Sequence, residues 1–236
     1  MSIAENIQAV RTRIEQAQAR SPFAEKKTRL MAVTKTMDPQ RINEAIAAGV
    51  DLIGENRVQE LLTKYDQLHL DGVEVHLIGH LQRNKVKYII DKVDMIQSVD
   101  SLPLAEEIER RAAFCQKVMP VLVEVHMGHE ESKFGVEPRD LSAFLQKLAI
   151  FPHISVRGLM TVPPPCEDHL QSKKLFSQFY ALFLDIRAQN LHNISMEICS
   201  MGMSGDFEAA VEEGSDLVRL GTAIFGKRNY QQIKGE

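Results

Sequence analysis

One lysine of the sequence has the surroundings that amine chemistry requires. Lys35 lies near the end of the apolar segment 30–36. In a β-strand the side chains alternate between two faces, so Met31, Val33 and Lys35 share one face, with Lys35 at the carboxyl end. A lysine amine among apolar neighbours loses its proton more easily and can attack an aldehyde to form a Schiff base. Taken alone, a solvent-exposed lysine is the commoner interpretation.

Two glycine-containing segments near the other end of the chain could hold a phosphate group. They span residues 199–206 and 219–226, and they accompany the last two expected strands. Glycines let backbone N–H groups approach an anion closely, and phosphate sites of α/β barrels recur in these two loops. Hydroxyl donors are present at Ser200, Ser204 and Thr222. Ordinary turns are the simpler interpretation of two other residues, Gly205 and Gly226.

Arg219 alternates with Val218 and Leu220, so it is expected to point into the interior of the sheet while its neighbours face outward. A buried guanidinium needs a partner. Opposite the ring nitrogen of a bound pyridine, its fixed positive charge would keep that nitrogen unprotonated and weaken the ring as an electron sink. A structural ion pair with Glu55 or Glu124 is the alternative.

Several further polar residues are candidates for weaker roles. A metal site could be built from His126, His129 and Glu130, although a loop surface is the preferred interpretation. Lys133 could attract phosphate, and a solvated lysine is the default. After the expected third strand, hydrogen bonds to a ligand or to loop backbone could come from His80 and Gln82.

Short apolar runs that alternate with longer amphipathic segments indicate repeated βα units. Eight such runs occur, the number that closes an α/β barrel. The sequence therefore predicts a single (β/α)8 TIM barrel domain over residues 1–236, preceded by an extra N-terminal helix with Ile3, Ile7, Val10 and Ile14 on one face. The expected strands are 30–35, 52–54, 75–78, 95–98, 121–125, 154–159, 196–199 and 217–220.

Local signals mark the ends of two expected helices. Asp38 can cap a helix and Pro39 suits its first turn. Gly49 and Gly214 occupy equivalent places in two similar helix-to-strand passages, where a left-handed residue ends the helix.

Composition limits the classes of function. The chain has 236 residues, 44% of them hydrophobic and 25% charged, and a formal net charge of −4 without long runs of one sign. Neither nucleic-acid binding nor membrane association is indicated. The N-terminus does not resemble a signal peptide, and three widely spaced cysteines fit a reducing cytoplasm. These are Cys115, Cys166 and Cys199.

The chain resembles the family of pyridoxal phosphate homeostasis proteins, also called the YggS or proline-synthetase co-transcribed family. The likeness runs nearly from end to end. It rests on the segments 32–36 (AVTKT), 54–60 (GENRVQE), 76–85 (HLIGHLQRNK), 98–101 (SVDS), 128–135, 157–161 (RGLMT), 200–204 (SMGMS) and 219–226 (RLGTAIFG). At His126 and Gly205 the chain departs from the usual residues, Asn and, in some members, Asp.

The resemblance implies a fold type III barrel that binds pyridoxal 5′-phosphate (PLP), similar to the N-terminal domain of bacterial alanine racemase. It also implies Lys35 as the Schiff-base lysine, Arg219 at the pyridine nitrogen and Asn56 beside the ring. Residues implied at the phosphate are Ser200, Gly202, Gly221 and Thr222, with Met201 lining the site through its backbone.

Three functions are compatible with these features. The first is a PLP carrier involved in vitamin B6 homeostasis without strong turnover, and no catalytic residue or metal is assigned. It would be a cytoplasmic monomer whose partners are PLP and PLP-requiring apoenzymes. The second is a PLP-dependent racemase or decarboxylase, disfavoured because the chain ends soon after residue 226 and no strand-end tyrosine offers a second base. The third, binding of another phosphorylated metabolite, leaves Lys35 unexplained.

Overall fold

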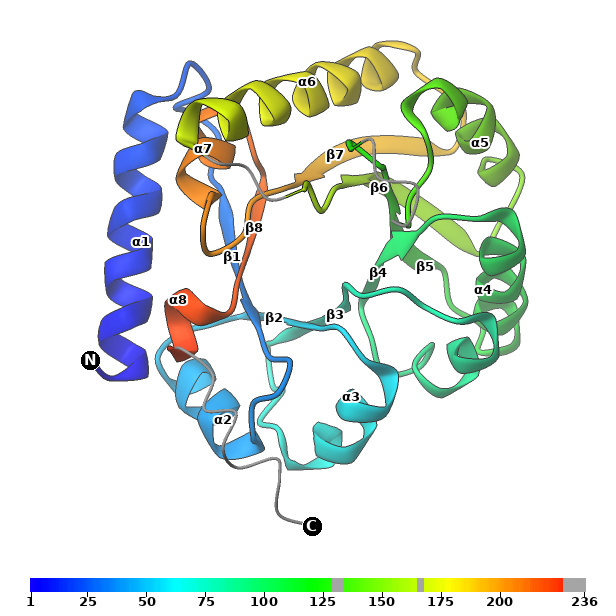
Figure 1. Ribbon diagram of the computed structural model, residues 1–236. Helices are drawn as coiled ribbons and strands as arrows, with labels where there is room; N and C mark the ends of the chain where they lie inside the picture. The colour runs from blue at the N-terminus through cyan, green and yellow to red at the C-terminus, as the bar shows by residue number, and fades with distance from the viewer. Residues whose placement is uncertain (129–133, 165–167, 227–236) are drawn as a thin grey trace.

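The computed structural model describes residues 1–128, 134–164 and 168–226 and contains a closed barrel of eight parallel strands in chain order (Figure 1). This confirms the expected fold. The strand boundaries differ from the expected ones by a few residues at most. The strands are β1 (Arg29–Val33), β2 (Leu52–Glu55), β3 (Glu74–Leu77), β4 (Met95–Val99), β5 (Met119–Glu124), β6 (Ile154–Met160), β7 (Ile194–Ser200) and β8 (Leu217–Leu220).

Helices and short 3-10 turns surround the barrel (Figure 1). The α-helices are α1 (Ile3–Arg20), α2 (Pro39–Ala47), α3 (Val58–Lys64), α4 (Leu102–Phe114), α5 (Leu141–Leu148), α6 (His169–Ala188), α7 (Phe207–Glu212) and α8 (Thr222–Phe225). The 3-10 turns are η1 (Tyr65–Gln67), η2 (Arg83–Tyr88) and η3 (Pro138–Asp140). Within the described part of the chain, no helix combines the length and apolar character needed to cross a membrane.

The helix boundary signals in the sequence are confirmed. The Asp38 carboxylate accepts a hydrogen bond from the backbone N–H of Arg41 at 2.9 Å, and Pro39 is the first residue of α2. Gly49 and Gly214 have φ angles of +90° and +94°, which an L side chain rarely adopts. At Gly214 a Cβ atom would also lie 2.8 Å from the ring of Tyr180, so the glycine is required for packing as well.

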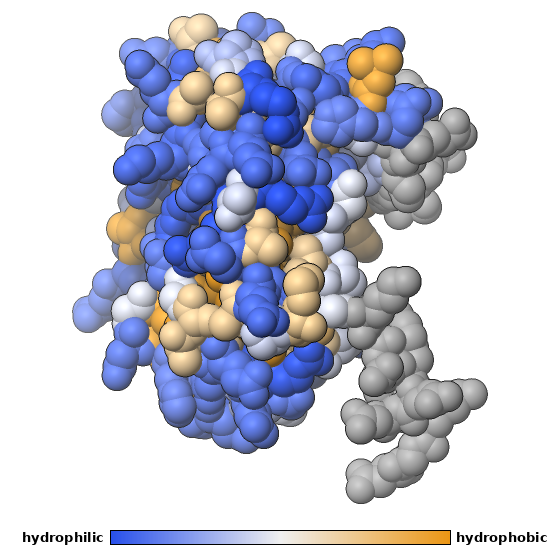
Figure 2. Space-filling view, turned by 90° about the vertical axis from the view of Figure 1, so that its left-hand side faces the viewer, coloured by the Kyte–Doolittle hydropathy of each residue, from blue (hydrophilic) through white to orange (hydrophobic). Residues whose placement is uncertain are grey.

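The extra helix α1 covers the outside of the barrel wall beside α7 and α8. It buries Ile3, Ile7, Val10 and Ile14, as its spacing predicts. The Asn6 amide donates a hydrogen bond to the carbonyl of Ile224 in α8, at 2.8 Å. The face that carries α1 is mostly hydrophilic, with apolar residues only in small groups (Figure 2). This helix therefore supports the short segment that follows β8.

The strands divide their side chains between two environments. Outward-facing residues such as Val218 and Leu220 join the large core between strands and helices, whereas inward-facing residues fill the barrel. Inside, one apolar group surrounds Met31 and another surrounds Met160. Met31 on β1 is in register with Arg219 on β8, so the ends of these two strands form adjacent parts of the barrel mouth.

Candidate functional site

A cavity of about 330 Å³ opens at the carboxyl ends of the strands. It falls within the size range of pockets that hold small ligands. Five of the residues expected to bind a cofactor line it: Lys35, Asn56, Arg219, Gly221 and Thr222. The remaining described lining residues are Val33, Met37, Ile78, Val162, Met203, Ser204, Gly205, Phe225 and Gly226.

Lys35 lies on this cavity, but its backbone position differs from the expected one. Strand β1 ends at Val33, so Lys35 belongs to the turn that follows rather than to the strand itself. The next residue, Thr36, has a φ angle of +64°, a conformation that is uncommon for a residue other than glycine. Val33 and Lys35 nevertheless lie on the same side of the chain, as expected, because both line the cavity.

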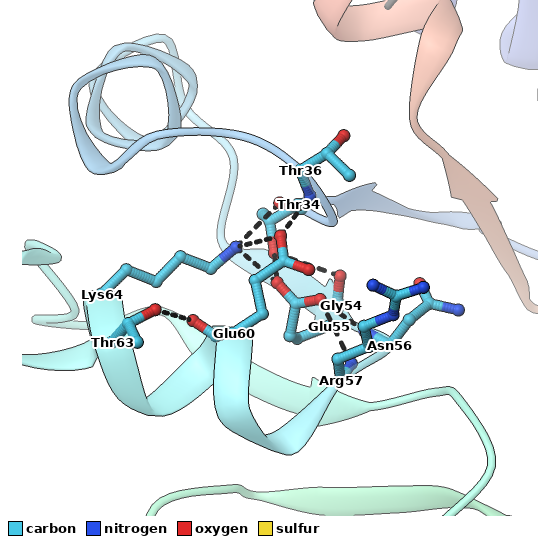
Figure 3. Close-up of polar contacts among 9 residues, drawn as sticks. All are labelled: Thr34, Thr36, Gly54, Glu55, Asn56, Arg57, Glu60, Thr63 and Lys64. Carbon is cyan, nitrogen blue, oxygen red and sulfur yellow. Dashed lines mark hydrogen bonds and ion pairs between the residues drawn. The ribbon is translucent and has the colours of Figure 1, made fainter. Parts of the chain in front are cut away.

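A buried cluster of charged residues holds this turn in place (Figure 3). The ammonium group of Lys64, on α3, lies 2.5 Å from the Glu55 carboxylate and 3.3 Å from the Glu60 carboxylate. It also donates a hydrogen bond to the backbone carbonyl of Thr34 at 2.9 Å. The Glu60 carboxylate in turn accepts a hydrogen bond from the backbone N–H of Thr36. The residues on both sides of Lys35 are therefore tied to α3.

Glu55 fixes Asn56 at the next strand end. Its carboxylate accepts hydrogen bonds from the backbone N–H groups of Asn56 at 2.7 Å and of Arg57 at 3.3 Å (Figure 3). The side-chain oxygen Oδ1 of Asn56 is buried, and no described residue donates a hydrogen bond to it. A buried acceptor of this kind is costly unless a ligand supplies a donor. Asn56 is thus positioned for a ligand with a hydroxyl or N–H group.

Arg219 points into the barrel, as the alternation of β8 predicts, and is only 4% exposed. One terminal nitrogen donates to the Ser200 hydroxyl and the other to the backbone carbonyl of Thr161, each at 2.7 Å. Burial lowers the pKa of Arg219 to about 10, with the charge of Glu124 opposing the shift. The guanidinium consequently remains charged at neutral pH. The alternative partner Glu55 pairs with Lys64 instead.

The two glycine-containing segments meet at the cavity. The Ser204 hydroxyl accepts hydrogen bonds from the backbone N–H groups of Gly221 at 3.2 Å and Ala223 at 3.3 Å. Gly205 and Gly226, interpreted from sequence as turn residues, also line the cavity. Gly202 has a φ of +98°, and a Cβ atom there would lie 2.6 Å from the Cβ of Ala210. Its role in the fold is to allow the close approach of α7.

Three residues that the resemblance implies at the site lie outside the described cavity lining: Ser200 and Gly202, implied at the phosphate, and Met201, implied to line the site through its backbone. The Ser200 hydroxyl accepts from Arg219 and donates to the Gln97 side-chain oxygen at 2.8 Å. Met201 is fully buried in the core outside the barrel. The sequence analysis treated residues 199–206 as a loop, so it did not predict that the Ser200 side chain points into the barrel and the Met201 side chain points out of it. A phosphate-binding role for Ser200 and Gly202 and a lining role for the Met201 backbone stay predictions.

Two of the other polar candidates, His80 and His126, have structural partners. His80 lies 3.3 Å from Asp100 and stacks on Phe134, and His126 Nδ1 lies 3.2 Å from Glu137. The described ranges contain no cluster of three or more His, Cys, Asp or Glu residues able to hold a metal. Gln82 precedes the turn η2. The remaining candidates lie outside the described residues: His129, Glu130 and Lys133.

Glu124 is a titratable residue whose environment the sequence did not reveal. It is 9% exposed at the end of β5, and burial raises its pKa to about 7, with a further contribution from the negative charge of Asp100. Arg219 acts in the opposite direction. The sequence offered Glu124 only as an alternative partner of Arg219, and in the structure the positive charge of Arg219 does lower the pKa of this carboxyl group.

Replacing Glu124 with glutamine should make stability less dependent on pH. In the unfolded chain the carboxyl group ionises near its ordinary pKa of 4.5, whereas in the folded protein it does so near 7. The folded state therefore binds more protons between these values, and wild-type stability falls as pH rises through this window. We expect the Glu124→Gln variant to gain about 2–3 kcal/mol relative to wild type between pH 5 and pH 8. Urea unfolding at both pH values measures this, and a pH-independent difference would contradict it.

Comparison with known proteins places the chain in a family. Residues 5–229 match the family described as alanine racemase, N-terminal domain. The pyridoxal phosphate homeostasis protein of Aquifex aeolicus is 41% identical over 230 residues, which cover 98% of this chain and 100% of the relative. The protein of the same name from Escherichia coli K12 is 34% identical, covering 98% of both chains.

Solved structures agree with this relationship. PipY of Synechococcus elongatus with PLP bound superposes with a TM-score of 0.83 at 32% identity, covering 95% of this chain and all of PipY. Alanine racemase of Streptomyces coelicolor shares the fold, with a TM-score of 0.71 at 18% identity, covering 94% of this chain and 58% of the racemase. The chain belongs to the family of pyridoxal phosphate homeostasis proteins.

Proposed function

We propose that this protein binds PLP in the cavity, holds it as a Schiff base on Lys35, and takes part in PLP homeostasis without strong catalytic turnover. The observation that carries the proposal is the meeting of Lys35, Asn56, Arg219 and Thr222 on one cavity. The relative PipY, of matching length and fold, has been solved with PLP bound.

The residues of the cavity fit the chemical groups of PLP. The aldehyde of PLP supplies the carbon to which a primary amine can bond, with loss of water. Lys35 supplies that amine. The buried Oδ1 of Asn56 has no hydrogen-bond donor among the described residues, and the hydroxyl group on the PLP ring could supply one. The permanent positive charge of Arg219 would keep the nitrogen of the PLP ring unprotonated if that nitrogen lay beside it. Thr222 offers a hydroxyl donor to a phosphate group, and the backbone N–H groups of Gly221 and Ala223, which now donate to the Ser204 hydroxyl, would have to turn from it to the phosphate.

Holding the cofactor is favoured over turning over an amino acid. Among the described residues that line the cavity, Lys35 and Arg219 are the ones with ionisable side chains, and the Arg219 guanidinium stays charged at neutral pH. A racemase or decarboxylase requires acid–base groups placed at the reacting carbon. The described tyrosines lie in helical segments away from the cavity lining: Tyr65 in η1, Tyr88 in η2 and Tyr180 in α6. This arrangement favours a protein that holds PLP over one that uses it to convert amino acids.

PLP titration followed by an amino-acid panel tests the proposed function. We expect about one equivalent of PLP to bind, with a visible absorption band, because each chain has a single Lys35, which lines this cavity. The loaded protein should then racemise or decarboxylate amino acids slowly or not at all, as followed by chiral chromatography and by CO₂ release. Free PLP at the same concentration serves as the control. Rapid turnover of any amino acid would overturn the non-enzymatic assignment, and absence of PLP binding would overturn the whole proposal.

The proposal extends to the partners of the protein. The cavity lies at the barrel mouth, where PLP held on Lys35 can be reached by PLP-requiring apoenzymes. We place the protein in the cytoplasm as a monomer, where Cys115 and Cys199, both free thiols in the structure, would stay reduced.

A further inference from the structure

A continuous line of polar side chains crosses the inside of the barrel. Glu74 Oε2 lies 3.2 Å from His76 Nε2, and His76 Nδ1 lies 2.9 Å from Gln97 Nε2. The Gln97 side-chain oxygen accepts from the Ser200 hydroxyl at 2.8 Å, and that hydroxyl accepts from Arg219 at 2.7 Å. These residues come from β3, β4, β7 and β8, and β3 and β7 lie on opposite sides of the barrel (Figure 1).

The line joins the cavity to solvent through the barrel interior. His76, Gln97 and Ser200 are 1%, 0% and 0% exposed. At the far end, the side chain of Glu74 is 46% exposed and pairs with Arg29 at 3.0 Å. Polar side chains are seldom fully buried unless each of their hydrogen-bonding groups has a partner. Barrel interiors are usually filled by apolar residues, so this polar layer is an unusual use of core positions.

Arg219 fixes the direction of every hydrogen bond in the line. A guanidinium can only donate, so the Ser200 hydroxyl must accept from it and can donate its own hydrogen to the Gln97 oxygen. The Gln97 NH₂ group then faces His76, whose Nδ1 must accept. The proton of a neutral His76 therefore lies on Nε2, directed at the Glu74 carboxylate. The hydrogen bond from His76 is the largest contribution that lowers the pKa of Glu74, to about 2, so this acceptor is ionised at neutral pH.

We propose that Gln97 and His76 are positioning residues for Arg219, acting through the Ser200 hydroxyl. This inference rests on the proposed function, in which Arg219 faces the PLP ring. One terminal nitrogen of Arg219 is held by the backbone carbonyl of Thr161. The other is held by the Ser200 hydroxyl, so its position depends on the orientation of that hydroxyl. Gln97 holds the Ser200 hydroxyl in the rotamer that accepts from Arg219, and His76 holds the Gln97 amide in the orientation that accepts from Ser200.

Matched variants test the line. Gln97→Met keeps a similar volume and removes both hydrogen bonds, and His76→Leu removes the acceptor for Gln97. His76→Asn should restore binding, because its side-chain oxygen can accept near the position of Nδ1. Leu122→Ala, inside the barrel but outside the line, is the control for general loss of packing. We expect Gln97→Met and His76→Leu to weaken PLP binding about tenfold and to shift the visible absorption of bound PLP, with neither change in His76→Asn or Leu122→Ala.

Two further outcomes separate this inference from the proposed function. Wild-type titration comes first, because a wild type that binds no PLP overturns the proposed function rather than the line. If wild type binds and Gln97→Met binds equally with the same spectrum, the positioning role is overturned. Independently of PLP, ¹⁵N NMR of the unliganded protein should show His76 as the Nε2–H tautomer, and an Nδ1–H tautomer would contradict the direction of the line.

Discussion

Replacing Lys35 with alanine is expected to abolish the absorption band of the PLP Schiff base while leaving the fold intact. The alanine variant cannot form a covalent bond to the aldehyde, so PLP would be retained only by its non-covalent contacts. Lys35 is partly exposed in a turn and contributes little to the core, so unfolding free energy should change by no more than about 0.5 kcal/mol. Absorption spectra and urea unfolding of the same preparations measure both effects.

Two control variants sharpen this experiment. Lys35→Arg keeps the positive charge but cannot form the Schiff base, so it should resemble the alanine variant in its spectrum. Lys147→Ala removes an exposed lysine of α5 on the outside of the barrel and should resemble wild type. Global unfolding of Lys35→Ala would indicate a structural role for this lysine instead.

Lys64→Met is expected to destabilise the protein by about 3–5 kcal/mol. Lys64 is 4% exposed and Glu55 is fully buried, so removal of the ammonium group leaves a carboxylate charge without its counter-ion. The methionine side chain retains most of the packing volume, which separates the charge effect from a cavity effect. Urea unfolding monitored by far-UV circular dichroism gives the loss.

The double variant Glu55→Gln/Lys64→Met provides the corresponding control. Once Glu55 is neutral, the loss of Lys64 should cost less than it does alone, because no buried charge is left unpaired. Since Lys64 also binds the carbonyl of Thr34, the single variant should additionally slow the covalent capture of PLP at Lys35. A loss below about 1 kcal/mol, the range of exposed ion pairs, would contradict the account of this cluster.

The sequence predicted the features that follow from the periodicity of strands. Alternation placed Val33 and Lys35 on one side, and Arg219 inside the barrel, and both directions agree with the structure. The prediction holds although β1 ends at Val33 and Lys35 lies in the turn that follows, since both residues line the cavity. Local signals such as Asp38 and Gly49 gave helix boundaries for a similar reason: their effect is confined to one turn.

Contacts between strands distant in the sequence could not be predicted in this way. The resemblance implies Ser200 at a phosphate, but the contacts of its hydroxyl with Gln97 and Arg219 could not be predicted, because only the closure of the barrel brings these residues together. Glu60 and Lys64 are four residues apart on α3, a spacing that is usual for an ion pair on a helix surface. The burial of Lys64 depends on how α3 packs against the turn that holds Lys35, which no local pattern encodes.

Borohydride reduction of the PLP-loaded protein, followed by peptide mapping, tests the central claim most directly. Reduction converts a Schiff base into a stable secondary amine, which retains the pyridoxyl group on the residue that carried it. We predict that this group is found on Lys35, at about one equivalent per chain, and that Lys147→Ala gives the same map. Recovery of the label mainly on another lysine, or of no label from a protein that binds PLP, would contradict covalent anchorage at Lys35.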